Sequence, residues 1–286
     1  MLTDDLEKSR PFHRIQIAND TLQTRISDFL CGNFSKSSNS LREDIVQRIF
    51  EEDFLVISIA HLCSNLEIFR ESCIQLSELL GALMVQNDAG DTVIEVFNRN
   101  VGRIEQGARY HQTRQGGDIH TDSVNRIEPM KYLVLGCAAP ALIGGETILL
   151  RAQDVVDELA HLPDVLNILR SKFYFEGRGM SSDVQLFELP VLSEKDGKPR
   201  FRYLRSYIAS AHERAGEPLT ADQEYAFDVL DSVLETSSLQ YRVTLRAGDI
   251  LIAEDTSVFH GRTSFVDGPV PGGWAPRRHM LRCWIS

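Results

Sequence analysis

Two histidines and one aspartate have the residue types and spacing of a mononuclear iron centre. His120 and Asp122 are separated by one residue, and His260 lies far downstream in the segment Val258-Phe259-His260-Gly261-Arg262. Two imidazoles and one carboxylate on one face of a metal leave the opposite face open, which is how non-haem Fe(II) binds a cosubstrate and O2 together. The pattern predicts an oxygen-activating enzyme.

The spacing has a geometric meaning if the first pair lies on a strand. Side chains at i and i+2 of a β-strand share one face, so an extended segment would point His120 and Asp122 in the same direction. The third ligand must come from another strand. Residues 249–253 are predicted to form a buried strand, and a short turn after it leads to His260.

A second interpretation of these residues is structural. A His-x-Asp triplet also arises by chance, in which case His120 is a surface loop residue and His260 a core histidine with ordinary hydrogen bonds. Downstream, however, the chain reads Arg277-Arg278-His279-Met280-Leu281-Arg282, although its formal net charge is −11. A basic cluster in an acidic chain favours a bound anion.

The order of motifs resembles the taurine dioxygenase and clavaminate synthase superfamily of Fe(II)- and 2-oxoglutarate-dependent oxygenases. The resemblance covers roughly residues 90 to 286. The motifs are Gly116-Gly117-Asp118-Ile119-His120-Thr121-Asp122, Gly144-Gly145-Glu146-Thr147, Leu245-Arg246-Ala247-Gly248-Asp249-Ile250-Leu251, the segment around His260, and the arginine cluster.

The resemblance implies a metal and a cosubstrate site. His120, Asp122 and His260 would be the iron ligands, and Arg278 with Thr147 would hold the distal carboxylate of 2-oxoglutarate, whose 2-keto acid end chelates the iron. A guanidinium gives a carboxylate two parallel charge-assisted hydrogen bonds, and a hydroxyl can add a third. The implied cofactor set is Fe(II) with 2-oxoglutarate and O2 as cosubstrates.

Two further arginines have open roles. Arg282 shares a strand face with Arg278, and the resemblance implies that it contacts either the substrate or the cosubstrate. Arg262 follows the ligand His260 and either supports it from behind or forms a salt bridge with Asp255 or Asp267.

Substrate contacts are predicted from two basic segments. Arg109, His111 and Arg114 precede the first ligand in a run of cationic, aromatic and hydrogen-bonding groups, although such a run is also typical of a solvated loop. Arg205 lies in a second basic segment at 201–207. Many relatives carry Asn-Asn-Arg before the distal histidine where this chain reads Ala253-Glu254-Asp255-Thr256-Ser257, so no substrate class is transferred.

The carboxylate at position 122 also limits the types of reaction that the site can catalyse. Halogenases of the superfamily have Gly or Ala at this position, which leaves a coordination site for chloride that Asp122 would fill. We expect hydroxylation, or desaturation or cyclisation, of a small polar metabolite such as an amino acid or a natural-product intermediate. The alternatives are a metal-binding sensor or scaffold without oxygenase activity, and an iron oxygenase that does not use 2-oxoglutarate.

The elements that must position these residues are predicted to form a mostly β, α+β fold with a double-stranded β-helix (jelly roll) core. We expect one domain over residues 1–286, with a helical flank over about 1–90, a core over about 91–286, and helical inserts over about 152–170 and 220–235. Ser40 opens a predicted helix whose Ile45, Ile49 and Phe50 share a face. Other predicted elements are a helix over 66–85 and strands over 54–59, 93–97, 131–138, 147–150, 187–192, 201–207 and 241–245.

The length and composition of the chain limit the classes of protein to which it can belong. A chain of 286 residues with 43% hydrophobic content can bury one large core. The pI near 5.2 argues against a nucleic-acid partner, and we expect a cytoplasmic protein without a membrane segment. Five cysteines without a Cys-x-x-Cys pair argue against a zinc site or a disulfide framework. The oligomeric state is left open.

Overall fold

The computed structural model describes residues 20–32, 38–103, 110–177, 185–268 and 272–286. Helix accounts for 38% and strand for 28% of these residues. The combination of helices with antiparallel sheets is confirmed. The expectation that the chain is mostly β is wrong, because helical residues outnumber strand residues where long helices flank and interrupt short strands. Among the described residues, no helix has both the length and the apolar character needed to cross a bilayer.

The larger sheet has five antiparallel strands in the order β1-β12-β4-β15-β2. Side chains alternate between its two faces. Ile250 and Ile252 pack in one hydrophobic cluster, while Leu251 between them packs in another. The strands are β1 Phe54–Ser58, β2 Val93–Val96, β4 Tyr132–Ala139, β12 Asp249–Glu254 and β15 His279–Ile285.

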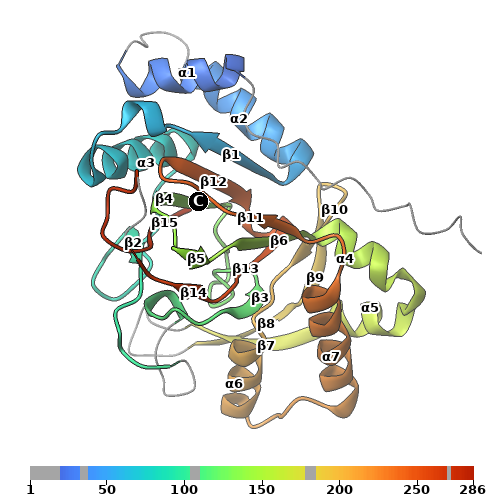
Figure 1. The fold of residues 1–286 in the computed structure, drawn as a ribbon. Helices are drawn as coiled ribbons and strands as arrows, with labels where there is room; N and C mark the ends of the chain where they lie inside the picture. The colour runs from blue at the N-terminus through green and yellow to red at the C-terminus, as the bar shows by residue number, and fades with distance from the viewer. Residues whose placement is uncertain (1–19, 33–37, 104–109, 178–184, 269–271) are drawn as a thin grey trace, which may run out of the picture.

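Three N-terminal helices cover the outer face of this sheet, at the top of Figure 1. They are α1 Asp20–Leu30, α2 Ser38–Glu52 and α3 Leu66–Leu80. Ile45 and Ile49 of α2 are buried as predicted, but Phe50 is 44% exposed, because it lies one residue further around the helix. The Lys198 ammonium lies over its ring.

The predicted helix over 66–85 is five residues too long. A Cβ on Gly81 would lie 2.4 Å from the backbone oxygen of Ser286, so no side chain fits where the helix meets the C-terminal strand. Beyond Gly81 the chain pairs with that strand instead, and the Met84 N–H donates to the Trp284 carbonyl.

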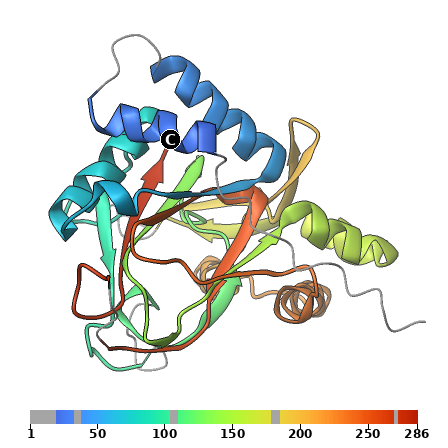
Figure 2. The same cartoon turned by 45° about the horizontal axis from the view of Figure 1, so that its top comes forward.

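The smaller sheet has four antiparallel strands in the order β11-β6-β13-β3. Leu149 of this sheet packs in the same cluster as Leu251 and Met280 of the larger sheet, so the two sheets face each other across a shared core. Figure 2 shows this arrangement from a tilted view. The strands are β3 Gly117–His120, β6 Thr147–Arg151, β11 Tyr241–Val243 and β13 Val258–Arg262.

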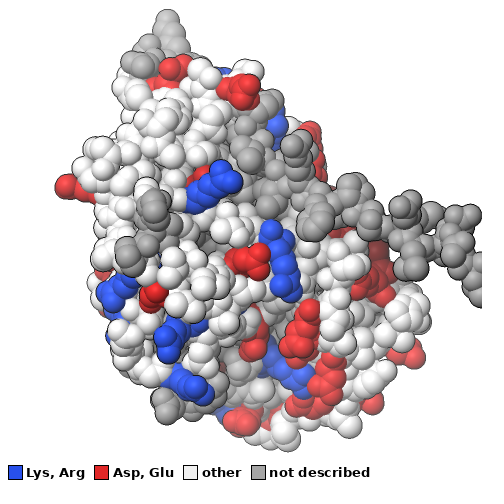
Figure 3. Space-filling view, in the orientation of Figure 1, with Lys and Arg blue, Asp and Glu red and all other residues white. Residues whose placement is uncertain are grey.

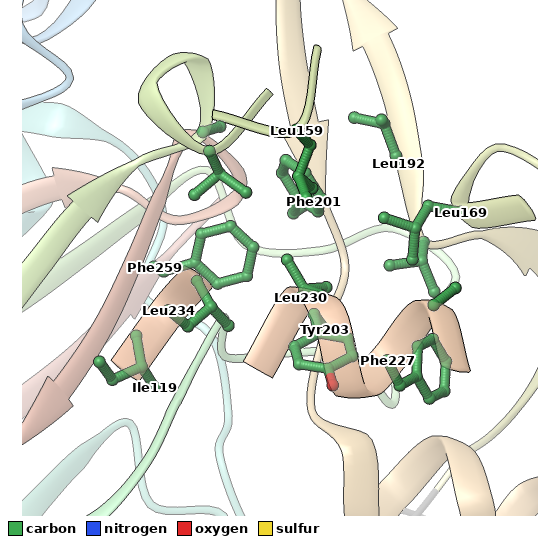
Figure 4. Close-up of a cluster of buried hydrophobic side chains, with 14 of the residues drawn as sticks. Ile119, Leu159, Leu169, Leu192, Phe201, Tyr203, Phe227, Leu230, Leu234 and Phe259 are labelled. Atoms are coloured by element: carbon green, nitrogen blue, oxygen red, sulfur yellow. The ribbon is translucent and has the colours of Figure 1, made fainter. Parts of the chain in front are cut away.

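Helical inserts cover the outer face of the smaller sheet. They are α4 Ala152–Glu158, α5 Pro163–Leu169, α6 Arg205–Ala215 and α7 Ala221–Thr236. Thr220 caps α7 through a capping box with Gln223. Figure 4 shows Ile119 and Phe259, the neighbours of the two histidines of interest, among the buried side chains of this cluster. Because strand side chains alternate, His120 and His260 point to the opposite face, toward the inter-sheet core.

Short paired strands complete the fold. Asp196 and Gly197, both with positive φ, form the turn of the hairpin that joins β9 and β10. The predicted strand over 201–207 is wrong after its first residue, because α6 begins at Arg205. The pairs are β5 Ile143–Gly144 with β14 Phe265–Val266, β7 Lys172–Glu176 with β8 Leu186–Pro190, and β9 Leu192–Lys195 with β10 Lys198–Phe201. The 3-10 turns are η1 Ala60–Leu62, η3 Tyr110–Gln112, η4 Leu159–His161 and η5 Asp255–Ser257.

The surface carries no broad basic region on the face shown in Figure 3, where acidic side chains gather at the lower right, over the part of the molecule that contains α7. This distribution agrees with the acidic balance of the sequence. All five cysteines are free, and Cys73, Cys137 and Cys283 are buried, as expected for small apolar side chains without a disulfide role.

Candidate metal and cosubstrate site

The two candidate histidines are brought together by strand pairing. His120 is the last residue of β3 and lies directly across from His260 of β13. Their ring centroids are 4.7 Å apart. Directly opposed side chains of neighbouring strands share one face, so both imidazoles point into the space between the two sheets.

Asp122 completes the cluster. Its carboxylate oxygens lie 3.6 Å from the Nε2 of His120 and 3.8 Å from the Nε2 of His260. One donor atom from each of the three residues lies within 4.8 Å of the others. Donor atoms this close together can converge on a single metal ion, and two imidazoles with one carboxylate suit a divalent iron.

The strand prediction for Asp122 is wrong. β3 ends at His120, so Asp122 lies in the loop beyond the strand. Its backbone N–H donates to the Asp255 carboxylate at 2.9 Å instead of joining a ladder. The carboxylate therefore reaches the histidines through the path of this loop.

Hydrogen bonds orient two of the three candidate ligands. The Nδ1 of His120 lies 2.7 Å from the carbonyl oxygen of Asp118; because a carbonyl can only accept, Nδ1 carries the proton and Nε2 is free to bind a metal. The Oδ2 of Asp122 accepts from the Trp284 indole at 3.1 Å and from the Arg282 guanidinium at 3.3 Å.

The electrostatics suit metal binding. Burial, together with the nearby His120, lowers the pKa of His260 to about 3, so its imidazole is neutral near pH 7. Burial would raise the pKa of Asp122, but Arg282 and then His120 hold it well below its usual range. Burial would lower the pKa of His120, yet Asp122 outweighs this and raises it. A divalent ion would replace the His120 proton as the partner of that carboxylate.

The cluster lines a cavity between the sheets. Thr147 lies opposite Arg262 in the β6–β13 pair, and Arg282 lies opposite Leu135 in the β15–β4 pair, so both sheets contribute. The lining residues are Val96, Tyr110, His111, His120, Asp122, Leu135, Thr147, His260, Gly261, Arg262, Arg278, Met280 and Arg282.

Arg278 is a buried cation with unused hydrogen-bonding capacity. Its side chain lies over the Phe265 ring, 5.0 Å from the centroid, and the residue is 4% exposed. Among the described residues, no acceptor pairs with its Nη1. Burial and the neighbouring Arg262 lower its pKa to about 10, so it is still charged near pH 7. A buried guanidinium with an unpaired N–H fits an incoming carboxylate, and Thr147 in the same cavity adds a hydroxyl.

The turn Gly144-Gly145 makes room for this guanidinium. Both glycines have positive φ, and a Cβ on Gly145 would lie 3.2 Å from the Nε of Arg278. The family resemblance included this turn in the motif that ends at Thr147. The structure gives the physical reason for a glycine at position 145, because a side chain there would crowd the Arg278 guanidinium.

Arg262 does not form the predicted ion pair. Within the described parts of the chain it has no carboxylate partner, and its guanidinium donates to the carbonyls of Thr113 and Gln115. It lies between two rings, 4.7 Å from the centroids of Tyr110 and Phe265. It therefore holds the segment that carries His111 against β13.

Arg282 contacts a candidate ligand as well as the cavity. Its Nη1 donates to Asp122 and its Nε donates to the Oε1 of Gln86 at 2.9 Å. Arg278 and Arg282 both line the cavity, but they do not share a strand face as predicted, because β15 begins at His279, after Arg278.

The other residues predicted to contact the substrate differ in their position relative to the cavity. His111 lines the cavity. Arg114 is exposed and is not among the lining residues, and Arg109 lies outside the described residues. The prediction that Arg205 contacts the substrate is wrong. Arg205 begins α6 instead of extending a strand toward the site, and its guanidinium binds Glu224, Asp228 and Asp231.

Sequence reasoning missed two contacts of Asp122. Trp284 lies two residues after Arg282 on β15, so strand alternation places it on the same face and could have identified it. Asp255 lies in the turn before β13, and no sequence signal pairs that turn with the loop after β3.

Comparisons with known proteins agree with this geometry. A profile of the taurine catabolism dioxygenase TauD, TfdA family matches residues 21–284. Asparagine oxygenase in complex with Fe(II), 2S,3S-3-hydroxyasparagine and succinate has a TM-score of 0.67 at 12% identity, covering 94% of this chain and 92% of that chain. The non-heme iron oxygenase OrfP in complex with Fe and alpha-ketoglutaric acid has a TM-score of 0.60 at 18% identity, covering 93% and 84%.

PvcB from Pseudomonas aeruginosa has a TM-score of 0.58 at 16% identity, covering 85% of this chain and 79% of that chain. At these identities the structural likeness is one of fold. The comparison with curated proteins gave no match.

Proposed function

We propose that this chain, which belongs to the taurine catabolism dioxygenase TauD, TfdA family of Fe(II)- and 2-oxoglutarate-dependent oxygenases, oxidises a C–H bond of an amino acid or a similarly small polar metabolite. One observation carries the proposal. One cavity is lined both by the cluster of His120, Asp122 and His260 and by Arg278, whose guanidinium has an N–H without an acceptor among the described residues.

The metal end is assigned to three ligands. His120 and His260 would bind Fe(II) through neutral imidazole nitrogens, and Asp122 would contribute one negative charge. The Trp284 and Arg282 donors to Oδ2 fix the carboxylate plane and leave Oδ1, the oxygen nearer His120, to face the ion. The cluster shares its cavity with ten other lining residues, and the cavity would give exogenous ligands access to the ion.

The cosubstrate end is assigned to Arg278 and Thr147. Arg278 would bind the distal carboxylate of 2-oxoglutarate through the Nη1 that has no acceptor among the described residues, and Thr147 would donate its hydroxyl. Pairing the buried cation with this anion would remove an uncompensated charge, so the interaction favours 2-oxoglutarate over a neutral molecule of similar size.

The chemistry comes from the bound groups. Fe(II) and 2-oxoglutarate together supply reductive activation of O2, by which 2-oxoglutarate and O2 become succinate and CO2 while a substrate C–H becomes C–OH. The apolar lining residues Val96, Leu135 and Met280 would limit the water that reaches the reacting atoms. Desaturation or cyclisation would use the same site with a different fate for the substrate carbon.

The amino-acid class of substrate rests on two structural neighbours. Asparagine oxygenase is described in complex with 3-hydroxyasparagine, and OrfP in complex with (3S)-hydroxy-L-Arg. In this chain His111 lies at the cavity and would contact the substrate, and Arg282 is the cation available to its carboxylate. Arg262 supports the His111 segment from behind.

The architecture that presents this site is proposed to be a double-stranded β-helix. Its five-stranded and four-stranded antiparallel sheets share one core and open on the cavity, which supports a single oxygenase domain over residues 1–286. A cytoplasmic location stays a prediction.

A turnover screen tests the proposal. The protein would be incubated in air with Fe(II), 2-oxoglutarate and each of the common amino acids in turn, and succinate and oxidised product would be measured by mass spectrometry. We expect at least one amino acid to raise succinate formation and to gain one oxygen or lose two hydrogens, with neither product in the Asp122→Ala variant. Succinate formation that no amino acid stimulates would refute the amino-acid class.

A further inference from the structure

We propose that Asp255 is a positioning residue that fixes the loop carrying Asp122 and thereby sets the affinity of the metal site. The inference rests on the proposed function, because it concerns the residue assigned there as the carboxylate ligand. The observation behind it is the end of β3 at His120, which leaves the backbone of Asp122 without a strand partner.

Asp255 takes the place of that missing partner. Its Oδ1 accepts the backbone N–H of Asp122 at 2.9 Å, and its Oδ2 accepts the hydroxyl of Ser123 at 3.0 Å. The residue is 1% exposed. Burying a carboxylate is costly unless donors satisfy it, and here the two donors belong to a ligand and its immediate neighbour.

The same contacts fix the path of the loop. Ser123 has a φ of 51°, which is uncommon for a residue other than glycine. Its Oγ also accepts the N–H of Met130 at 3.1 Å, and the N–H of Asp255 donates to the carbonyl of Lys131 at 3.1 Å. The loop from 122 to 131 is thus tied to Asp255 at both ends, which holds the turn at Ser123 that aims Asp122 at the histidines.

Asp255 also connects the two parts of the chain that supply ligands. It lies in η5, directly before the strand that carries His260, and it is 133 residues from Asp122 in the sequence. The adjoining Glu254 binds Arg200 at 2.8 Å, so this turn is itself anchored. A displacement of Asp255 would therefore change the distance between Asp122 and His260.

A carboxylate fits this position better than an amide. An asparagine could accept the Asp122 N–H with its Oδ1, but its Nδ2 is a donor, so the contact with Ser123 would survive only with its direction reversed and with the hydroxyl proton turned to another acceptor. Asp255→Asn should therefore keep one contact and weaken the other, and Asp255→Ala should lose both.

The test measures metal affinity separately from catalysis. Co(II) would be titrated into the wild-type apoprotein and the Asp255→Asn, Asp255→Ala and Ser123→Ala variants, following the visible d–d bands, with thermal unfolding of each apoprotein in parallel. The matched control is Glu176→Gln, since Glu176 is another buried carboxylate that accepts from a serine and an arginine, at the contact of α6 with β7.

We expect Asp255→Ala to weaken Co(II) binding at least about tenfold and Asp255→Asn about threefold to tenfold, with altered d–d bands at saturation. Glu176→Gln should lower the unfolding temperature while Co(II) affinity stays within about twofold of wild type. If Asp255→Ala does not fold, Asp255→Asn and Ser123→Ala decide the outcome.

Variants that fold and bind Co(II) with wild-type affinity and spectrum would overturn the positioning role and leave the proposed function standing. A wild-type protein that binds no Co(II) would overturn both. Equal losses of affinity in the Asp255 variants and in Glu176→Gln would reduce Asp255 to a general stability role and so refute the inference.

Discussion

The metal end and the arginine end of the cavity differ in how fully the described residues satisfy their charged groups. Trp284 and Arg282 donate to the carboxylate of Asp122, whereas Arg278 is 4% exposed with an Nη1 that has no acceptor in the described part of the chain. The neighbouring Arg262 is equally buried but donates to two backbone carbonyls. In the proposed site, the protein would thus orient the metal ligand Asp122 in advance and leave Arg278 to be neutralised by the cosubstrate.

The largest effect is expected from Asp122→Ala. The substitution removes the only anionic ligand, so Fe(II) affinity and turnover should fall by more than the roughly 100-fold that loss of an outer contact costs. Equilibrium dialysis with iron analysis measures this. Asp118→Asn is the control, since the Asp118 side chain is exposed and only its carbonyl contacts His120. Stoichiometric iron in Asp122→Ala would contradict the assignment.

Arg278→Met should separate binding from stability. Losing a buried charge partner costs about 2 to 5 kcal/mol, so 2-oxoglutarate affinity should fall at least about 30-fold. The apoprotein should be as stable as wild type or more stable, because a buried cation with an unpaired N–H is removed. Calorimetric titration with 2-oxoglutarate and thermal unfolding measure the two effects. Unchanged 2-oxoglutarate affinity would remove Arg278 from the site.

Arg262→Met should lower the stability of the protein more than its affinity for 2-oxoglutarate, which is the opposite of Arg278→Met. It removes the guanidinium that donates to the carbonyls of Thr113 and Gln115, which should cost about 1 to 3 kcal/mol of unfolding free energy. The 2-oxoglutarate affinity should change less than in Arg278→Met. Urea unfolding checks the first statement, and the calorimetric titration checks the second. An Arg262→Met protein more stable than wild type would contradict the structural role given to Arg262 and its difference from Arg278.

Metal affinity should rise with pH. Asp122 raises the pKa of His120 above its ordinary 6.5, although burial acts the other way. In the apoprotein, protonated His120 contributes stability that is fully present below about pH 6.5 and is lost as the pH rises through the raised pKa. The metal needs the neutral ring, so its apparent affinity should increase by at most about tenfold per pH unit over the same range and then level off. A pH-independent Co(II) affinity across neutral pH would contradict this.

Trp284→Phe is expected to have the smallest effect. It removes the indole N–H that donates to Asp122 while retaining an aromatic ring, and Arg282 still donates to the same oxygen. Metal affinity should fall about threefold to tenfold, near the lower end for outer contacts. Co(II) titration measures it, with Trp274→Phe as the control, because Trp274 packs against Phe69 in the helix-covered cluster.

Local sequence signals predicted the histidines and the strands that carry them. Alternation and the buried strand over 249–253 indicated how His260 is presented, and the family resemblance added Arg278 and Thr147, which line the same cavity. These features depend on short-range patterns or on residue types within a motif.

Long-range packing decided what the sequence could not predict. Asp122 lies beyond its strand because Asp255, distant in sequence, binds its backbone. Arg205 was placed on a strand and instead begins a helix, where three acidic side chains bind it. The helix predicted to reach residue 85 stops at Leu80 because the C-terminal strand occupies the space beyond Gly81.

The most direct test of the central claim is anaerobic. Fe(II) and then 2-oxoglutarate are added to the apoprotein, and the visible metal-to-ligand charge-transfer band of the chelate is recorded for wild type, Asp122→Ala and Arg278→Met. Our account predicts a band in wild type that weakens in both variants, because one loses the metal ligand and the other loses the carboxylate partner. Iron binding without a band in wild type would contradict a shared site for Fe(II) and 2-oxoglutarate.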